Sequence, residues 1–316
     1  VTTQLIGRPD RIGRFATTSG SIANRVLNAT PGSGIRKVAA KVTGVSPIRL
    51  LPPYAKQRFS SWFAKRPTVT LAQRQGRVTV FPTCLVEYHE TGIGKDLVRV
   101  YERNGIECSN TGAGCCGAPW LHAGNVEEFI KVAGKNVVKL AAEVRAGTDI
   151  VIPQPTCSYI IKQDYPDYVG GTDAELVSDH TYDAAEYLMN VHMGEDTSLD
   201  TDFTGETLAE ITYHAPCHLR AQDIGLASRD LMKLTGATVT VVQQCSGIDG
   251  LWGLRAGNEE IAIPIAERLG EQITEAGGDA VAGDCHLANT AIAEQTGREA
   301  RHPLQVIARA YGIAEE

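Results

Sequence analysis

The sequence predicts an α/β protein in which two tandem, pseudo-twofold-related parallel-sheet domains follow a basic helical N-terminal segment. A cysteine pattern written twice, strand-like runs that alternate with helical patterns, and a charge contrast between the two ends predict this architecture. A chain of 316 residues is long enough for two domains of ordinary size plus an appendage. We expect the basic segment over residues 1–76, the first domain over 77–200 and a second, degenerate domain over 201–316.

Seven of the eight cysteines form the repeated pattern. They are Cys84, the pair Cys115 and Cys116, and Cys157 in the first half, and Cys217, Cys245 and Cys285 in the second. Thiolates are soft ligands that select zinc, copper(I) or iron–sulfur clusters. Residues 1–6 lack the pattern of a secretory signal, so we expect a reducing, cytoplasmic environment in which cysteines are ligands or redox groups rather than disulfides. The pattern therefore predicts bound metal.

Each cysteine group follows a short run that is rich in Val and Ile, which is typical of a strand. The runs are residues 78–81, 105–108, 149–152, 211–213, 238–242 and 279–282. Helical patterns lie between them, most clearly over residues 126–146 and 259–276. Alternating strands and helices favour parallel βαβ units, whose ligands gather outside the carboxyl ends of the strands. We therefore expect the cysteines of each half to converge.

The N-terminal segment is strongly basic. Residues 1–76 hold thirteen Lys and Arg and a single acid, Asp10, although the whole chain has a net charge of −7. Amphipathic stretches at about residues 11–27, 35–42 and 54–64 place apolar side chains beside this charge, which suits a membrane surface or an acidic partner. The alternative is a cap that packs on the chain's own acidic domains. Nucleic acid is disfavoured, because no nucleic-acid-binding module accompanies the charge.

Four motifs point to a known family. They are residues 114–119 (GCCGAP), 154–160 (QPTCSYI), 213–220 (YHAPCHLR) and 245–253 (CSGIDGLWG). In order and content they resemble the cysteine-rich CCG domain family over about residues 78–316. This family includes the B subunit of heterodisulfide reductase, iron–sulfur subunits of glycolate and lactate oxidation, and the C subunit of anaerobic glycerol-3-phosphate dehydrogenase, whose linker the basic segment also resembles.

The resemblance implies an electron-transfer subunit of an oxidoreductase complex. Such a subunit takes electrons from a flavin dehydrogenase and passes them towards quinone at the inner face of the cell membrane. Family members usually carry a ferredoxin domain with two CxxCxxCxxxCP runs, which this sequence does not contain. We therefore expect a ferredoxin-type domain upstream or in a separate subunit, together with a flavin dehydrogenase subunit and a membrane surface as partners.

The resemblance also implies the ligand sets, and the departures from it matter. A complete half of the family supplies five cysteines. The first half here has Cys84, Cys115, Cys116 and Cys157, with Gln154 in place of the fifth cysteine. Four thiolates suffice for a [4Fe-4S] cluster, which we expect at this first site.

The second half has lost more of the pattern. Ser246 and Ala288 replace two cysteines, so Cys217, Cys245 and Cys285 remain. Three thiolates can hold zinc together with a histidine or water, or an incompletely ligated cluster, or nothing. His218 is the imidazole that we assign to this metal site, and His214 and His286 are the other candidates.

Three functional hypotheses follow. The first is the iron–sulfur electron-transfer subunit. The second is a thiol–disulfide redox enzyme like heterodisulfide reductase, against which the lost cysteines count. The third is a structural subunit that zinc stabilises and that has lost its redox function. A histidine-paired catalytic cysteine is disfavoured, because the adjacent Cys115 and Cys116 suit cluster ligation better. Cys108 lies outside both sets, and we expect it to be a small buried apolar residue.

Overall fold

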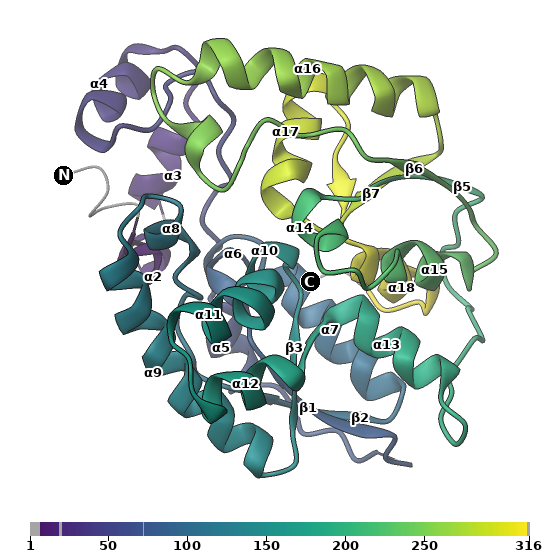
Figure 1. The fold of residues 1–316 in the computed structure, drawn as a ribbon. Helices are drawn as coiled ribbons and strands as arrows, with labels where there is room; N and C mark the ends of the chain where they lie inside the picture. Colours follow the sequence, from purple (N-terminus) through teal and green to yellow (C-terminus); the bar gives the residue numbers. More distant parts are fainter. Residues whose placement is uncertain (1–6, 19–20, 72, 315–316) are drawn as a thin grey trace.

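The chain folds into two similar α/β halves, each built on a four-stranded parallel sheet (Figure 1). The computed structural model describes residues 7–18, 21–71 and 73–314. The strand orders are β2-β1-β3-β4 and β6-β5-β7-β8, so corresponding strands occupy corresponding places, and the predicted fold class is confirmed. The strands are β1 (Gly76–Val80), β2 (Ile106–Asn110), β3 (Asp149–Ile152), β4 (Thr181–Asp183), β5 (Glu210–His214), β6 (Thr238–Val242), β7 (Ala280–Gly283) and β8 (Ala300–Arg301).

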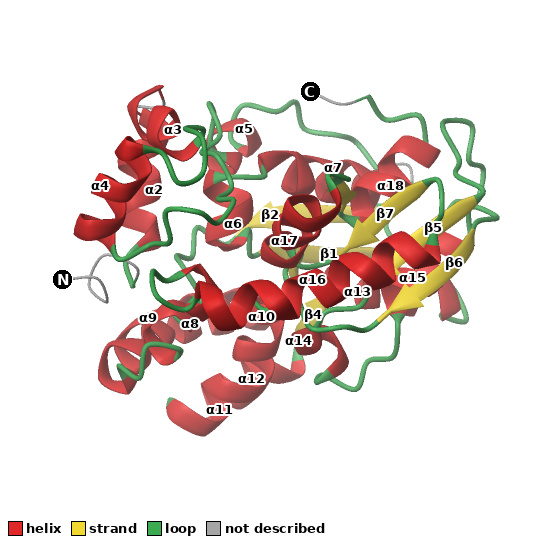
Figure 2. Ribbon diagram, turned by 90° about the horizontal axis from the view of Figure 1, so that it is seen from above, coloured by secondary structure: helices red, strands yellow, loops and turns green. Residues whose placement is uncertain are grey.

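Helices cover both faces of the sheets, which is the usual outcome for parallel strands (Figure 2). Those of the first half are α6 (Thr83–Tyr88), α7 (Thr91–Arg103), α8 (Ala118–Leu121), α9 (Val126–Arg145), α10 (Pro155–Tyr159), the π-helical turn η1 (Ile160–Asp164), α11 (Tyr165–Tyr168), α12 (Thr172–Asp179) and α13 (Ala184–Met193). Those of the second half are α14 (Cys217–Arg220), α15 (Ala227–Lys233), the 3-10 turn η2 (Trp252–Leu254), α16 (Glu259–Ala276), α17 (His286–Thr296) and α18 (Pro303–Ala310).

The two longest helices are those that the apolar periodicity predicted. In α9, the side chain of Asn125 accepts a hydrogen bond from the backbone N–H of Glu128, and Arg145 lies in the last turn, where it complements the helix dipole. The buried face of α9 is apolar apart from Asn136. The predicted domain boundaries at residues 77 and 201 stay predictions.

β4 and β8 were not anticipated from the sequence. They have only three and two residues, which is too short for an alternating pattern. Each leads into a helix with a capping box, formed by Asp183 and Glu186 before α13 and by His302 and Gln305 before α18. The shared arrangement strengthens the case for duplication, since even the unpredicted elements repeat.

The halves meet through helices that the pseudo-twofold relation exchanges. α7 packs on α18, and α13 packs on α15. One continuous apolar core spans this interface and includes Leu97 and Tyr101 of the first half with Leu231 and Ile307 of the second. The two sheets are therefore held in one fixed arrangement.

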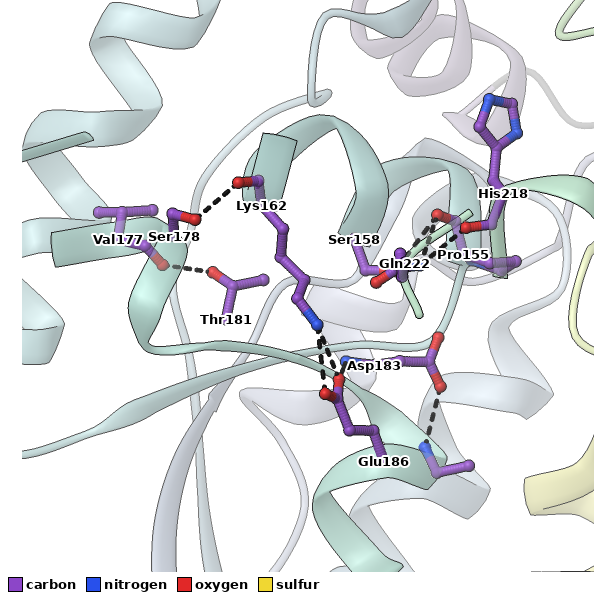
Figure 3. Close-up of polar contacts among 11 residues, drawn as sticks. Pro155, Ser158, Lys162, Val177, Ser178, Thr181, Asp183, Glu186, His218 and Gln222 are labelled. Carbon is purple, nitrogen blue, oxygen red and sulfur yellow. Dashed lines mark hydrogen bonds and ion pairs between the residues drawn. The ribbon is translucent and has the colours of Figure 1, made fainter. Parts of the chain in front are cut away.

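Buried polar groups also lie at the interface. The Nε2 atom of His302 lies 3.0 Å from the carbonyl oxygen of Pro153. Asp183, the N-cap residue of α13, is the equivalent of His302 in the first half, and the charge of Asp284 acts on it. The carboxylate of Asp284 accepts hydrogen bonds from the hydroxyls of Tyr213 (2.5 Å) and Ser228. Figure 3 shows Asp183 at the start of α13, beside the Lys162–Glu186 ion pair.

Asp183→Asn should make the protein more stable at neutral and alkaline pH. Burial, followed by the charge of Asp284, raises the pKa of Asp183 well above its usual range. A carboxyl whose pKa is raised on folding favours the folded state at low pH, and this contribution is lost as pH rises through the folded pKa. Asparagine keeps the N-cap acceptor and does not titrate.

The free energy of unfolding in urea, measured from about pH 5 to about pH 8, checks this expectation. The advantage of Asp183→Asn over the natural chain should grow with pH. Asp173→Asn, at a largely exposed position on α12, is the control and should give a curve parallel to that of the natural chain. Parallel curves for both variants would contradict the raised pKa of Asp183.

The N-terminal segment forms α2 (Pro9–Thr18), α3 (Ser21–Leu27), α4 (Gly34–Thr43) and α5 (Phe59–Phe63). The prediction that residues 1–6 are not a secretory signal concerns residues outside the described part of the chain. Residues 19–20, within the predicted amphipathic stretch 11–27, also lie outside it. Phe59 of α5 is fully buried and joins the core that α7 helps to build. The backbone and hydroxyl of Ser60 both donate hydrogen bonds to Glu87 of α6, which fixes α5 to the first half.

Candidate metal centre

One cavity of about 780 Å³ is lined by all seven cysteines of the repeated pattern. The residues that follow β1, β2 and β3 form one side of it, and those that follow β5, β6 and β7 form another. We expected two separate convergent groups, but the structure brings both groups to the same chamber. The reason is the interface between the halves, which sets the carboxyl ends of the two sheets against each other.

The first cysteine set is compact and mostly buried. The sulfurs of Cys116 and Cys157 lie 3.1 Å apart, and the thiol of Cys115 is hydrogen-bonded to those of Cys84 and Cys116. The hydrogen bond to Cys115, followed by burial, raises the pKa of the Cys84 thiol well above its usual value. The pKa values of the other three thiols are also raised. The set is therefore a row of thiols that hold their protons unless a cation replaces them.

A buried polar network holds the backbone of the adjacent cysteines. Nδ2 of Asn136 donates to the carbonyl oxygen of Cys115 at 2.9 Å and contacts the Tyr165 hydroxyl at 3.0 Å. That hydroxyl donates to the carbonyl oxygen of Cys116 at 2.9 Å. Partners of this kind orient metal ligands. Neither residue was predicted from the sequence, although Asn136 carries a signal as the one polar side chain on the buried face of α9.

The turns beside the cysteines require special backbone conformations. Gly117 has φ +94°, and a Cβ atom there would lie 2.8 Å from the ring of Phe129. Its N–H donates to the sulfur of Cys115 at 3.4 Å. Thr83, directly before Cys84, has φ +63°, which is rare for a β-branched residue and is the kind of strain that gathers at functional sites.

The second cysteine set is more open. Cys217 and Cys245 are exposed and Cys285 is half-buried. The sulfur of Cys245 accepts a hydrogen bond of 3.4 Å from the N–H of Gly247, which repeats the turn of Cys115 and Gly117. Burial raises the pKa of Cys285, and the charge of Cys217 adds to the shift. A hydrogen bond with Cys116 lowers the pKa of Cys157, but burial and the charges of Cys84 and Cys115 raise it, and Cys285 adds the smallest contribution, so the two sets approach each other at Cys157 and Cys285.

The three candidate imidazoles take different positions. His218 lines the cavity, where its Nδ1 lies 3.2 Å from the Thr156 hydroxyl and its ring stacks on His122. His214 also lines the cavity, and its Nε2 lies 3.0 Å from the carbonyl oxygen of Gln244. His286 is not among the residues that line it. Burial lowers the pKa of His218 and that of His214, the latter to about 4, so both rings are neutral donors or acceptors at pH 7.

A closed single-ion site is not preformed in the part of the chain that the structure describes, since no three His, Cys, Asp or Glu side chains there surround one metal position. Zinc bound by Cys217, Cys245, Cys285 and His218 therefore stays a prediction. The four thiols of the first set do fit a larger soft group. They are neighbours, the pKa values of their thiols are raised, and they share a mostly apolar chamber of a size that holds small ligands.

The N-terminal segment supplies the third wall of the cavity. We call its residues 7–18 and 21–55 the cover. Val45 forms a β-bridge with Arg255, and Arg49 forms an ion pair with Glu294 at 2.9 Å. Asp10, the single acid of the basic segment, accepts a hydrogen bond of 2.9 Å from the N–H of Cys115. The cover thus packs on both halves, as the alternative of an intramolecular cap describes, and closes one side of the chamber.

Cys108 behaves as expected for a residue outside both sets. It is 7% exposed, belongs to the core on β2 and does not line the cavity. Burial raises the pKa of its thiol. A substitution of Cys108 is therefore a suitable control for substitutions of the cavity cysteines.

A family model described as "CCG: Cysteine-rich domain" matches residues 78–162 and 211–292, the stretches that carry the two cysteine sets. The chain belongs to the cysteine-rich CCG domain family. The two matches cover the first three strands of each sheet and the turns that bear the cysteines, while β4 and β8 lie outside them, so each match falls within one half of this structure.

Three similar proteins are informative. The C subunit of anaerobic glycerol-3-phosphate dehydrogenase of Escherichia coli (strain K12) is 27% identical over 97% of this chain and 76% of its own length. Lactate utilization protein A of Bacillus cereus (strain G9842) is 30% identical over 66% of this chain and 87% of its own. The B subunit of fumarate reductase (CoM/CoB) of Methanothermobacter marburgensis is 27% identical over 73% of this chain and 44% of its own. The first of these similarities extends over the N-terminal cover as well.

Proposed function

We propose that this chain is an iron–sulfur electron-transfer subunit of a membrane-associated, flavin-linked dehydrogenase, and that it passes electrons towards quinone. The convergence of Cys84, Cys115, Cys116 and Cys157 in one buried chamber carries the proposal. Two of the similar proteins are named as subunits of a dehydrogenase and of a reductase, which supports a role inside a larger redox complex. A flavin dehydrogenase subunit and a ferredoxin-type domain or subunit are the partners that we propose.

The residues of the first set would hold a [4Fe-4S] cluster, which supplies one-electron redox chemistry when it is bound. Asn136 and Tyr165 orient the backbone of two of the ligands, and the cover limits access of water from one side. A cluster with an incomplete ligand shell, or zinc, is the occupant that we propose for the second set.

Metal analysis of anaerobically purified protein tests the proposal. We expect iron and acid-labile sulfide in amounts that account for at least one cluster, with broad absorption in the visible range. Removal of the metal with a strong chelator should abolish this absorption together with electron transfer to an artificial acceptor. Zinc without iron would favour the structural subunit, and reduction of a disulfide substrate by the iron-loaded protein would favour the thiol–disulfide enzyme.

Membrane association is the second part of the proposal. In the part of the chain that the structure describes, no helix is long and apolar enough to cross a bilayer. α4 nevertheless turns an apolar stripe outward, with Ile35, Val38 and Val42 between 50% and 65% exposed. Lys37 and Lys41 are exposed on the same helix. Apolar side chains flanked by basic ones suit the surface of an anionic bilayer, and we place the protein at the inner face of the cell membrane on this ground.

Sedimentation with lipid vesicles checks the role of α4. The natural protein should bind vesicles that contain anionic lipid, and the binding should weaken with added salt. Val38→Glu combined with Val42→Glu should lower the affinity by about tenfold or more, because the change places charge in the inserted face. Val138→Glu, at a similarly exposed position on α9, is the matched control. Equal effects of the two changes, or no vesicle binding at all, would show that α4 does not dock on lipid.

A further inference from the structure

Gln154 occupies the place in the first half that Cys285 occupies in the second. Each is the N-cap residue of the helix that follows the third strand of its half, α10 in one case and α17 in the other. Both residues line the cavity. The sequence shows only that a cysteine is missing here, whereas the structure shows what stands in its place.

The side-chain amide of Gln154 has a defined orientation. It is 1% exposed, and its Oε1 accepts a hydrogen bond of 3.3 Å from the backbone N–H of His286. A backbone N–H can only donate, so the oxygen of the amide must face His286. The Nε2 group is consequently turned away from His286, and it is buried without a hydrogen-bond partner among the described residues.

An unpartnered buried donor destabilises a folded protein and calls for an explanation. Gln154 precedes Cys157 by one helical turn, and both residues line the cavity with Cys84, Cys115 and Cys116. The sulfurs of these cysteines, and of any cluster that they hold, are therefore acceptors within the same chamber that its N–H groups can meet. Hydrogen bonds to the sulfurs of an iron–sulfur centre are among the factors that set its reduction potential.

We propose that Gln154 is a positioning residue whose Nε2 group donates a hydrogen bond to a sulfur of the cluster at the first set, and that it thereby raises the reduction potential of that cluster. This inference rests on the proposed function. Reduction adds negative charge to the cluster, so a hydrogen-bond donor stabilises the reduced form more than the oxidised form. A complete family half has a ligand cysteine at this position. Here Gln154 would alter the reduction potential of the cluster and would not act as a ligand.

Potentiometric titration of the anaerobic, iron-loaded protein, followed by electron paramagnetic resonance, tests the inference. Gln154→Leu removes the donor. Gln154→Glu in its ionised form replaces it with a negative charge, which disfavours the reduced cluster further, and keeps an acceptor for the N–H of His286. Both variants should retain their iron and titrate at a more negative potential. At a fixed applied potential the ratio of reduced to oxidised clusters should fall by about tenfold.

Gln222→Leu is the matched control. Gln222 is also buried, and it does not line the cavity. Its Nε2 already donates to Ser158 at 3.0 Å, to the carbonyl oxygen of His218 at 3.1 Å and to that of Pro155 at 3.3 Å (Figure 3). Its loss should therefore lower stability and leave the potential unchanged.

The proposed function and the role of Gln154 would be contradicted by different results. A natural protein that holds no iron would overturn the proposed function. An iron-loaded protein whose potential is the same in Gln154→Leu and Gln154→Glu as in the natural chain would overturn only the role of Gln154. An equal shift in Gln222→Leu would do the same, because it would show that loss of any nearby buried amide moves the potential.

Discussion

Cys116→Ser should deplete the protein of iron and reduce electron transfer to background. Cys116 is 1% exposed, and its sulfur lies 3.1 Å from that of Cys157 at the centre of the first set. Serine has nearly the same shape but is a poor ligand for iron, which soft thiolates bind best. The metal-free variant should therefore unfold within about 1 kcal/mol of the metal-free natural protein.

Two comparisons sharpen this test. Cys108→Ala, at a buried cysteine outside the cavity, should keep its iron and its turnover. Cys245→Ala alters the exposed second set and should lower stability more than turnover, with the loss of stability confined to protein that carries metal. Full iron content in Cys116→Ser would remove Cys116 from the ligand set. Equal loss of turnover in Cys245→Ala and Cys116→Ser, with unchanged melting of Cys245→Ala, would show that the second set is a working redox centre.

Asp96→Ala should destabilise the protein by about 3–5 kcal/mol. Asp96 on α7 forms an ion pair with Arg309 on α18, across the interface of the two halves, and the side chains are only 5% and 9% exposed. Removal of the carboxylate would take this ion pair away from a buried guanidinium at the place where the halves join. The free energy of unfolding in urea, measured on metal-free protein, checks this value.

The exposed ion pair of Arg145 and Asp173 provides the contrast. Its side chains are 57% and 42% exposed, so Asp173→Ala should change the free energy of unfolding by less than about 1 kcal/mol. Replacement of both Asp96 and Arg309 by apolar residues should recover much of the stability lost in Asp96→Ala, because the buried guanidinium is then removed together with the carboxylate. Similar losses for Asp96→Ala and Asp173→Ala would show that the interface does not depend on the buried pair.

The sequence by itself determined the fold class and the chemical nature of the site. Runs such as residues 78–81 and 238–242 are rich in β-branched side chains and form strands wherever a parallel sheet can bury them. The long helices α9 and α16 follow from apolar periodicity, and the repeated cysteines mark the turns that follow the strands. These features are local, or repeat at a fixed spacing, so one sequence is enough to expose them.

Only the tertiary structure decided how these parts meet. The single chamber arises from the packing of α7 on α18 and of α13 on α15, which involves helix faces far apart in the chain. The two shortest strands, β4 and β8, form because a neighbouring strand pairs with each of them. Their residues carry no pattern that a sequence window could detect.

The finer features of the site are also tertiary. Asn136 reaches Cys115 across 21 positions of the chain, and Asp10 reaches the same residue across 105. The amide of Gln154 is oriented by the N–H of His286 in the other half of the molecule. A hydrogen bond depends on distance and angle in space, and sequence spacing constrains neither once the partners lie on separate elements. The residue types thus indicated a metal-binding protein, while the arrangement that would tune the metal exists only where the two halves and the cover come together.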